Sequence, residues 1–170
     1  LVRAFAQMPG EWQLVILGEG PEREVIRAEA MQLGLAHRVH LPGFVADPAK
    51  AAGLFDLFAL SSHSEQFPIS VLEAMAAGLA IAAPAVGDVA GMVSEANRPF
   101  IVPSGDEAAL AKALTQLAEN PDLRRSIGAA NREMARVDYE EKAMIAAYRE
   151  VYSGAMGKAT HSRACIGRRV

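Results

Sequence analysis

Short apolar runs alternate with helix-like stretches along most of this chain of 170 residues. The expected strands are the apolar runs 13–17, 38–41, 56–60, 80–83 and 100–102. The expected helices are 21–35, 47–54, 68–78, 106–119, 121–134 and 139–152. Strands that alternate with helices predict an α/β fold, a Rossmann-like parallel sheet with helices on both faces. The hydrophobic fraction of 51% and the mean hydropathy of +0.13 agree with a domain that buries its strands.

The loops that follow the expected strands are the natural place to look for a binding site. In open parallel sheets, ligands bind beyond the carboxyl ends of the strands. Here these loops are 18–20, 43–45, 61–67 and 84–91, and three of the four are rich in glycine or small hydroxyl residues. We expect all four loops to open onto one edge of the sheet, which we call the rim.

Two glutamates, Glu65 and Glu73, are separated by seven residues at the third of these loops. Pro68 suits the first turn of a helix and Gly78 suits the end of one. Glu73 is therefore expected on a short helix, and Glu65 in the loop before it. The start of that helix offers free N–H groups and a partial positive charge, which suit a phosphate. The spacing alone is weak, because any surface helix can carry two acids eight positions apart.

The segment 61–78 resembles the E-x7-E segment of retaining glycosyltransferases with the GT-B fold, which use UDP-, GDP- or ADP-sugars. The resemblance implies that Glu65 contacts the donor sugar as the catalytic residue and that Glu73 binds the ribose of the nucleotide. It further implies the C-terminal, donor-binding half of an enzyme that moves a sugar from a nucleotide sugar to an acceptor hydroxyl, in polysaccharide or glycolipid biosynthesis. The residues around the two glutamates that strengthen it are Phe67, Pro68, Leu72, Ala74, Met75, Ala76 and Gly78.

Further donor contacts are implied by the same resemblance. Gly18 and Gly20 resemble a G-x-G-P turn of the family, although any tight turn from a strand into a helix also favours glycine. The backbone at Phe44 and Val45 is implied in recognition of the base, and the alternative is that Phe44 packs in the core. The other implied donor-binding residues lie around the glutamate helix and are Ser62, Phe67, Ile69, Ser70 and Leu72.

The sequence departs from the family pattern at two places. Pro68 stands where the commoner family form has glycine, which removes one amide from the turn. Gly91 stands where the family often has a glutamate, so part of the donor loop differs. The family pattern gives His63 no role, and His40, at an apolar strand position, is expected to be structural.

The charges of the chain limit its partners. The formal net charge is −3, yet residues 153–170 contain four Lys or Arg and no acid, so the rest of the chain is acidic. An acidic domain with few aromatic residues argues against a nucleic-acid partner. The expected division is a nucleotide-sugar-binding domain at 1–152 and a basic, disordered tail at 153–170. The single cysteine, Cys165, excludes an internal disulfide.

The rim also lacks groups that a diphosphate needs. A nucleotide diphosphate carries about two to three negative charges that need compensation in a cleft, and the rim loops contain few cations. No Asp-x-Asp motif or metal-ligand spacing occurs, so neither a metal nor a cofactor is expected. The chain starts inside a helix, so a first strand, its cationic clamp and an acceptor-binding domain are expected upstream of Leu1.

No apolar run reaches the roughly 18 residues that cross a bilayer, and no signal peptide is visible. A cytoplasmic location is expected, with contact to the inner face of a membrane only through the intact parent protein.

Two other function classes stay open at this point. A nucleotide-sugar epimerase with the same fold would need acid and base groups near the sugar, for which His63 is the candidate. A non-catalytic nucleotide-binding α/β module is the other, of which a receiver-like domain would need an acid at the carboxyl end of a strand. Asp56 lies instead at the start of one. A third possibility is that this chain alone binds nucleotide but turns nothing over.

Overall fold

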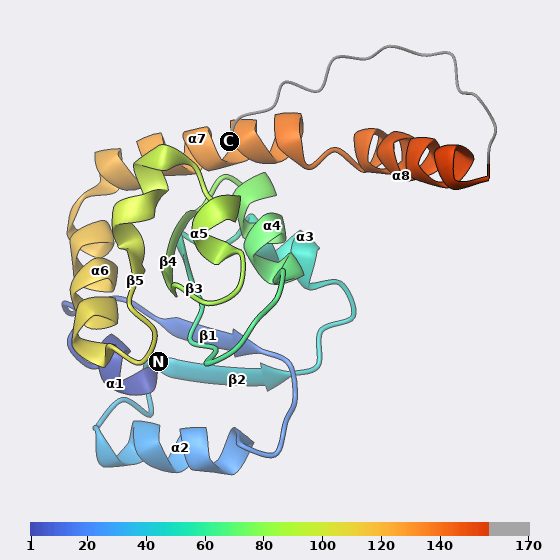
Figure 1. The fold of residues 1–170 in the computed structure, drawn as a ribbon. Helices are drawn as coiled ribbons and strands as arrows, with labels where there is room; N and C mark the ends of the chain where they lie inside the picture. The colour runs from blue at the N-terminus through green and yellow to red at the C-terminus, as the bar shows by residue number, and fades with distance from the viewer. Residues whose placement is uncertain (157–170) are drawn as a thin grey trace.

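The computed structural model describes residues 1–156 of the chain as an α/β domain from which the last helix projects (Figure 1). The strands are β1 (Leu14–Leu17), β2 (Val39–Gly43), β3 (Leu57–Ala59), β4 (Ala80–Pro84) and β5 (Ile101–Val102). The helices are α1 (Val2–Phe5), α2 (Arg23–Gln32), α3 (Pro48–Ala52), α4 (Ile69–Ala76), α5 (Val89–Met92), α6 (Glu107–Glu119), α7 (Pro121–Asp138) and α8 (Glu141–Ala155). A 3₁₀ helix, η1 (Glu95–Phe100), precedes β5.

All strand pairs are parallel, as the order of the elements predicts. They form two sheets rather than the single sheet expected from the sequence, because the described residues contain no ladder between β1 and β3. One sheet is β1–β2, in which Leu14 pairs with Val39. The other is β3–β4–β5, in which Phe58 pairs with Ile81.

Hydrophobic clusters lie on both faces of β4, the central strand of the second sheet. Ala80 and Ala82 belong to a cluster with α1 and α6, whereas Ile81 and Ala83 belong to a cluster with α4 and α5. Because successive side chains of a strand point to opposite faces, helices cover both faces here. All five residues of β4 are buried, so this strand lies in the centre of the core.

Two buried asparagines connect β4 to the helices beside it. The side chain of Asn97 accepts a hydrogen bond from the Ile81 amide at 2.8 Å and donates one to the Ile81 carbonyl at 2.7 Å. Asn131 donates to the Leu79 carbonyl and to Asn97, both at 2.8 Å, and accepts from the Ser94 hydroxyl at 2.7 Å. Strand β5 has two residues and pairs with Ala83 and Pro84 of β4. Asn97 therefore supplies the hydrogen bonds that the buried amide and carbonyl of Ile81 need.

The described elements follow the expected ones closely, with three differences. The sequence did not indicate α5 or η1, both of which follow β4. Helix α8 continues to Ala155, so residues 153–155, expected in the tail, are helical. Residues 157–170 of the predicted tail, which include Cys165, lie outside the described residues. Within the part of the chain that the structure describes, no helix is both long and apolar enough to cross a membrane.

Candidate functional site

The two glutamates lie as the sequence predicts. Helix α4 starts at Ile69 and its N-cap is Pro68, so Glu73 is helical and Glu65 is in the loop before it. Both glutamates are half-buried. No side chain caps α4, and the Val71 amide donates to the Pro68 carbonyl at 3.1 Å. The amides of Ile69 and Ser70 are therefore the ones that α4 offers to another partner. None of the serines of the loop, including Ser62, acts as a cap.

The loop that carries Glu65 is held by the turn that follows β4. The Asp88 amide donates a hydrogen bond to the Gln66 carbonyl at 2.9 Å. Gly87 has φ +52°, and a Cβ there would lie 2.5 Å from the Gln66 carbonyl oxygen and closer still to that of Glu65. No other residue type fits so close to another backbone, so Gly87 allows two rim loops to pack together.

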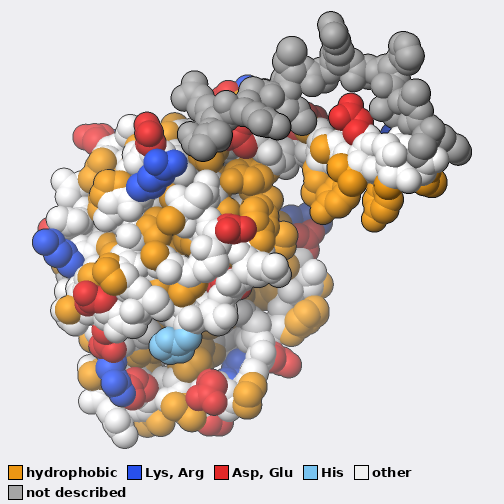
Figure 2. Space-filling model, viewed as in Figure 1, with side chains coloured by type: hydrophobic (Ala, Val, Ile, Leu, Met, Phe, Trp, Pro, Cys, Tyr) orange, Lys and Arg blue, Asp and Glu red, His pale blue; other side chains and the backbone are white. Residues whose placement is uncertain are grey.

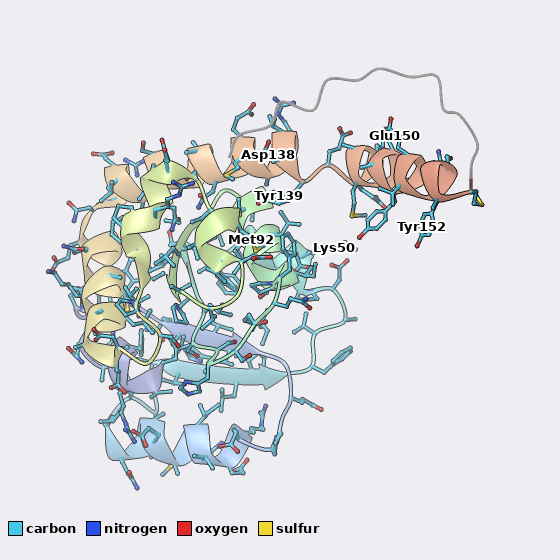
Figure 3. All side chains as sticks on the ribbon, in the orientation of Figure 1. Lys50, Met92, Asp138, Tyr139, Glu150 and Tyr152 are labelled. Atoms are coloured by element: carbon cyan, nitrogen blue, oxygen red, sulfur yellow. The ribbon has the colours of Figure 1, made fainter. Side chains whose placement is uncertain are left out.

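Phe67, next in this loop, packs on an aromatic side chain that the sequence analysis did not place in the site. The rings of Phe67 and Tyr139 are 5.8 Å apart at an angle of 60°, a tilted geometry that aromatic pairs favour. Tyr139 lies just beyond the end of α7 (Figure 3). Burial is the main cause of the raised pKa of its hydroxyl, and the charges of Asp138 and Asp88 add to it. No sequence signal connected Tyr139, 72 positions further along the chain, to the loop.

The first two rim loops are joined to each other. The Gly18 amide donates a hydrogen bond to the Gly43 carbonyl at 2.9 Å. Arg23, in the first turn of α2, reaches the same place and donates to the Leu41 carbonyl at 2.5 Å. A guanidinium group therefore lies at this part of the rim, where the sequence predicts only a helix over 21–35.

The base-recognition candidates follow β2 at the end of this part of the rim. The side chain of Phe44 is 75% exposed, so the alternative that it packs in the core is wrong. Val45 beside it is half-buried, and Gly20 is exposed. These positions are open to a ligand.

The loop after β3 borders a small pocket of about 170 Å³. Ser61, Ser62 and His63 line it together with Asp106 and Glu107 from the start of α6. The pocket therefore lies between the loops that follow β3 and β5. The serine hydroxyls line it from the first loop, and the carboxylates of Asp106 and Glu107 line it from the other side.

Four further positions differ in their surroundings. Ile69 is 60% exposed and Ser70 is exposed, both in the first turn of α4. Leu72 lies on another face of α4, where it lines a depression with Arg132 and Tyr139. His40, expected to be structural, is exposed, and its Nε2 lies 2.8 Å from the Oε1 of Gln13.

The rim thus consists of two parts within the described residues. One part joins the loops after β1 and β2, and the other joins the loops after β3, β4 and β5. Residues 1–156 contain no cluster of three or more His, Cys, Asp or Glu side chains arranged for a metal ion. The arrangement offers uncapped helix amides, two carboxylates and exposed glycines, which suit a phosphorylated ligand that also carries hydroxyl groups.

Known proteins resemble this chain in sequence and in fold. The sequence profile of the family described as "Glycosyl transferases group 1" matches residues 1–134. The lipopolysaccharide core biosynthesis glycosyltransferase LpsD of Rhizobium meliloti is 27% identical over 158 residues, which are 93% of this chain and 46% of that protein. The chain spans less than half the length of such relatives.

Solved structures agree with this assignment. The Anabaena protein Alr3699/HepE, crystallised with UDP, superimposes with a TM-score of 0.84 at 24% identity, over 91% of this chain and 44% of that one. The C-terminal domain of the glycosyl transferase group 1 family protein LpcC from Francisella tularensis matches with a TM-score of 0.73 at 22% identity, over 82% of this chain and 77% of that one. The fold is thus that of the C-terminal half of GT-B enzymes, and the chain belongs to the group 1 family of glycosyltransferases.

Proposed function

We propose that this chain is the donor-binding half of a retaining glycosyltransferase that transfers a sugar from a nucleotide sugar to an acceptor hydroxyl. The observation that carries the proposal is the placement of Glu65 in the loop before α4 and of Glu73 on α4 itself, a helix without a side-chain cap. HepE, which has the same fold, is described in complex with UDP and with UDP-glucose, which supports a nucleotide-sugar donor. The names of relatives that act in lipopolysaccharide core biosynthesis support the assembly of a bacterial polysaccharide or glycolipid.

Each part of the rim has a role in this proposal. The first-turn amides of α4 bind the diphosphate, because a helix N-terminus stabilises negative charge. Glu73 accepts hydrogen bonds from the ribose hydroxyls. The loop amides and side chains from Ser62 to Ser70 surround the diphosphate and the sugar, and the backbone at Phe44 and Val45 contacts the base.

Glu65 is the residue that we assign to the chemical step. Positive charge develops on the donor sugar as the bond to the diphosphate breaks, and a fixed carboxylate beside it stabilises that charge. The carboxylate needs a fixed position to do so, which the contact of its loop with Gly87 provides. Neither a metal ion nor a cofactor takes part in the proposed reaction, and the acceptor is bound by the part of the protein outside this sequence.

Donor binding is tested on this chain by titration with UDP, GDP and ADP, followed by amide NMR. We expect shifts at residues 18–20, 44–45 and 65–73, with an affinity of about millimolar, because Arg23 is the one cation described at the rim.

Glu73→Gln is expected to weaken binding roughly tenfold or more, since a hydrogen bond to a charged group contributes about 1.5–3 kcal/mol. Glu119→Gln, on the exposed last turn of α6, is the matched control. Shifts confined to α6, α7 and α8, or equal affinities for the two variants, would exclude this binding site.

Transfer itself is measured on the longer polypeptide, with a radiolabelled nucleotide sugar and the cell's own glycolipid fraction as acceptor. Glu65→Gln is expected to lower turnover about 100-fold or more while changing the affinity for the nucleotide diphosphate less than twofold. Glu73→Gln is expected to show the opposite pattern. Conversion of the donor sugar into its epimer without any acceptor would assign the chain to the epimerases instead.

A further inference from the structure

Tyr139 lies where three parts of the candidate site meet. It directly follows the last residue of α7, and its ring packs on that of Phe67, in the loop before α4, with the centroids 5.8 Å apart. It lines a depression together with Leu72 of α4. Burial raises the pKa of its hydroxyl, and the charges of Asp138 and of Asp88, in the turn after β4, raise it further. Tyr139 thus borders the loop, the helix and the turn at once.

The backbone of Tyr139 is attached to a rigid part of the domain. Its amide donates a hydrogen bond to the Ala135 carbonyl at 3.2 Å, in the last turn of α7. Helix α7 packs against α4 and β4, and its side chains Ile127 and Asn131 are fully buried. The ring of Tyr139 also packs against the hydrophobic cluster of β4, α4 and α5. Since buried side chains are closely packed, this ring is a fixed support for whatever packs on it.

Two contacts hold the loop between β3 and α4 near Glu65. The Asp88 amide donates to the Gln66 carbonyl at 2.9 Å, so the turn after β4 holds the loop by its backbone. The packing on Tyr139 holds it by a side chain, that of Phe67, which is 38% exposed. Because Glu65 lies only two positions before Phe67, a shift of Phe67 also displaces the carboxylate of Glu65.

We propose that Tyr139 is a positioning residue for the sugar transfer, which holds the Glu65 carboxylate in place through the ring of Phe67. Tyr139 acts through Phe67 and does not itself touch the donor. The inference rests on the proposed function, in which Glu65 stabilises positive charge on the donor sugar. That stabilisation needs a fixed distance, and a displacement of about 1 Å lowers a reaction rate up to about 100-fold.

The ring of Tyr139 makes the contact with Phe67, whereas its hydroxyl stays protonated near neutral pH, since burial raises its pKa. Tyr139→Phe therefore keeps the contact. Tyr139→Leu keeps an apolar side chain but lacks the ring, whose charge distribution favours tilted packing on another ring. The two variants thus separate the aromatic contact from the burial of apolar surface.

The position of the loop is followed on this chain by amide hydrogen exchange. The Asp88 amide reports on it, because its hydrogen bond ends on the loop, and exchange, unlike a chemical shift, does not respond to the loss of a ring by itself. Tyr139→Leu is expected to speed exchange at Asp88 about fivefold or more, since local opening sets the rate. Tyr139→Phe is expected to change it less than about twofold.

Turnover is measured on the longer polypeptide with a radiolabelled nucleotide sugar. Tyr139→Leu is expected to lower kcat about tenfold, less than the roughly 100-fold of a displacement of about 1 Å, because the hydrogen bond from Asp88 remains. The affinity for the nucleotide diphosphate is expected to change less than about threefold, because the amides of Ile69 and Ser70 belong to α4 rather than to the loop. Tyr139→Phe is expected to stay within about twofold in both quantities.

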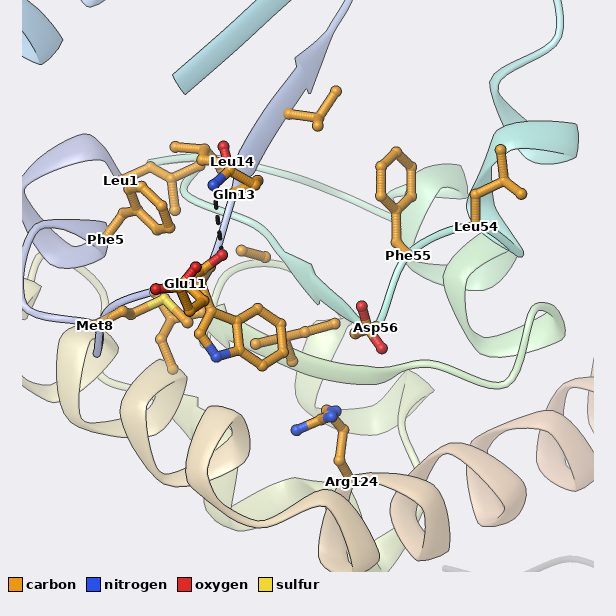
Figure 4. A pocket seen from close by; sticks show the side chains of 15 residues that line it. Leu1, Phe5, Met8, Glu11, Gln13, Leu14, Leu54, Phe55, Asp56 and Arg124 are labelled. Carbon is orange, nitrogen blue, oxygen red and sulfur yellow. Dashed lines mark hydrogen bonds between the residues drawn. The ribbon is translucent and has the colours of Figure 1, made fainter. Parts of the chain in front are cut away.

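Phe55→Leu is the matched control. Phe55 is a half-buried aromatic residue that packs against the same hydrophobic cluster as Tyr139. It precedes β3, at the end of the strand opposite the rim, and lines a groove of about 470 Å³ between the two sheets (Figure 4). We expect Phe55→Leu to leave Asp88 exchange and turnover within about twofold. Urea unfolding of both leucine variants shows how much stability each one loses.

The same contact is removed from its other side by Phe67→Leu, which tests the proposal even if Tyr139→Leu does not fold. The two single variants are expected to lose similar turnover. The double variant is expected to lose less than about twofold more than either single variant, because two substitutions that remove one shared contact are not additive. Losses that multiply, to about 100-fold in the double variant, would overturn the proposal.

Equal losses of turnover in Tyr139→Leu and Phe55→Leu would also overturn the positioning role, since both would then act through the stability of the domain. So would unchanged turnover in Tyr139→Leu, or an equal loss in Tyr139→Phe. Glu65→Gln is measured beside these variants. Turnover that Glu65→Gln leaves unchanged would remove the function assigned to Glu65, and the positioning role with it. An impaired Glu65→Gln beside a normal Tyr139→Leu would overturn the positioning role alone.

Discussion

Gly87 determines how closely the turn after β4 approaches the loop that carries Glu65. Its positive φ and its contact with two carbonyl groups of that loop leave no room for a side chain. The position of the proposed catalytic carboxylate therefore depends on a residue without functional groups. The sequence places Gly87 in a rim loop, but only the structure shows that two rim loops meet there.

Gly87→Ala is expected to displace residues 65–67 and to weaken nucleotide binding roughly tenfold, about 1.4 kcal/mol. Gly105→Ala is the control for backbone strain, because Gly105 has φ +82° but no atom within 4 Å of an added Cβ. Gly91→Ala, with neither feature, is the control for the substitution itself. The measurement is the NMR titration with UDP, together with the amide shifts of the loop. Similar shifts of residues 65–67 in the Gly87 and Gly105 variants would show that the contact has no special effect.

Helices α7 and α8 differ in how much of their surface packs against the rest of the domain. Helix α7 packs against α4, β4 and η1, and its Ile127 is fully buried. Helix α8 projects from the domain, and its apolar side chains form one exposed stripe (Figure 2). The exposed members of the stripe are Met144, Ile145, Tyr148, Val151 and Tyr152. The spacing of these residues is that of an amphipathic helix.

Truncations at two helix positions measure this difference. Ile127→Ala is expected to lower the free energy of unfolding by about 2–5 kcal/mol, because it leaves a cavity in the core. Val151→Ala, whose side chain is 69% exposed, is expected to change it by less than about 0.5 kcal/mol. Urea unfolding followed by circular dichroism gives both values. A loss above 1 kcal/mol for Val151→Ala would mean that α8 packs on the domain in solution.

The parts of the fold that could be predicted are the single strands and helices, because each depends on residues that are close together in the sequence. The apolar runs gave every strand to within about three residues, and Pro68 and Gly78 correctly bounded the glutamate helix, because a strand or a helix depends on residues near in sequence. The division of the strands into two sheets was not predictable, because β1 and β3 have the apolar composition of neighbours in one sheet. Their separation depends on which segments of the polypeptide lie between them.

The candidate site was predictable to the same extent. The glutamates and the loop glycines follow from motifs, each within a short segment, whereas the sequence left open whether Phe44 is exposed or packs in the core. The approach of Gly87 to Glu65, the packing of Tyr139 on Phe67 and the hydrogen bond of Arg23 to the Leu41 carbonyl connect positions 18 to 72 residues apart. A single sequence contains no local signal for such contacts, because they depend on how whole elements pack.

The contact between Phe67 and Tyr139 links the rim to the direction in which α8 leaves the domain. Tyr139 directly follows the last residue of α7, and α8 begins two residues later at Glu141. A change in the direction of α8 at this junction would therefore move the backbone beside Tyr139, whose ring packs on Phe67 in the loop before α4. This one aromatic pair connects the loop of Glu65 with the segment from which α8 leaves the domain.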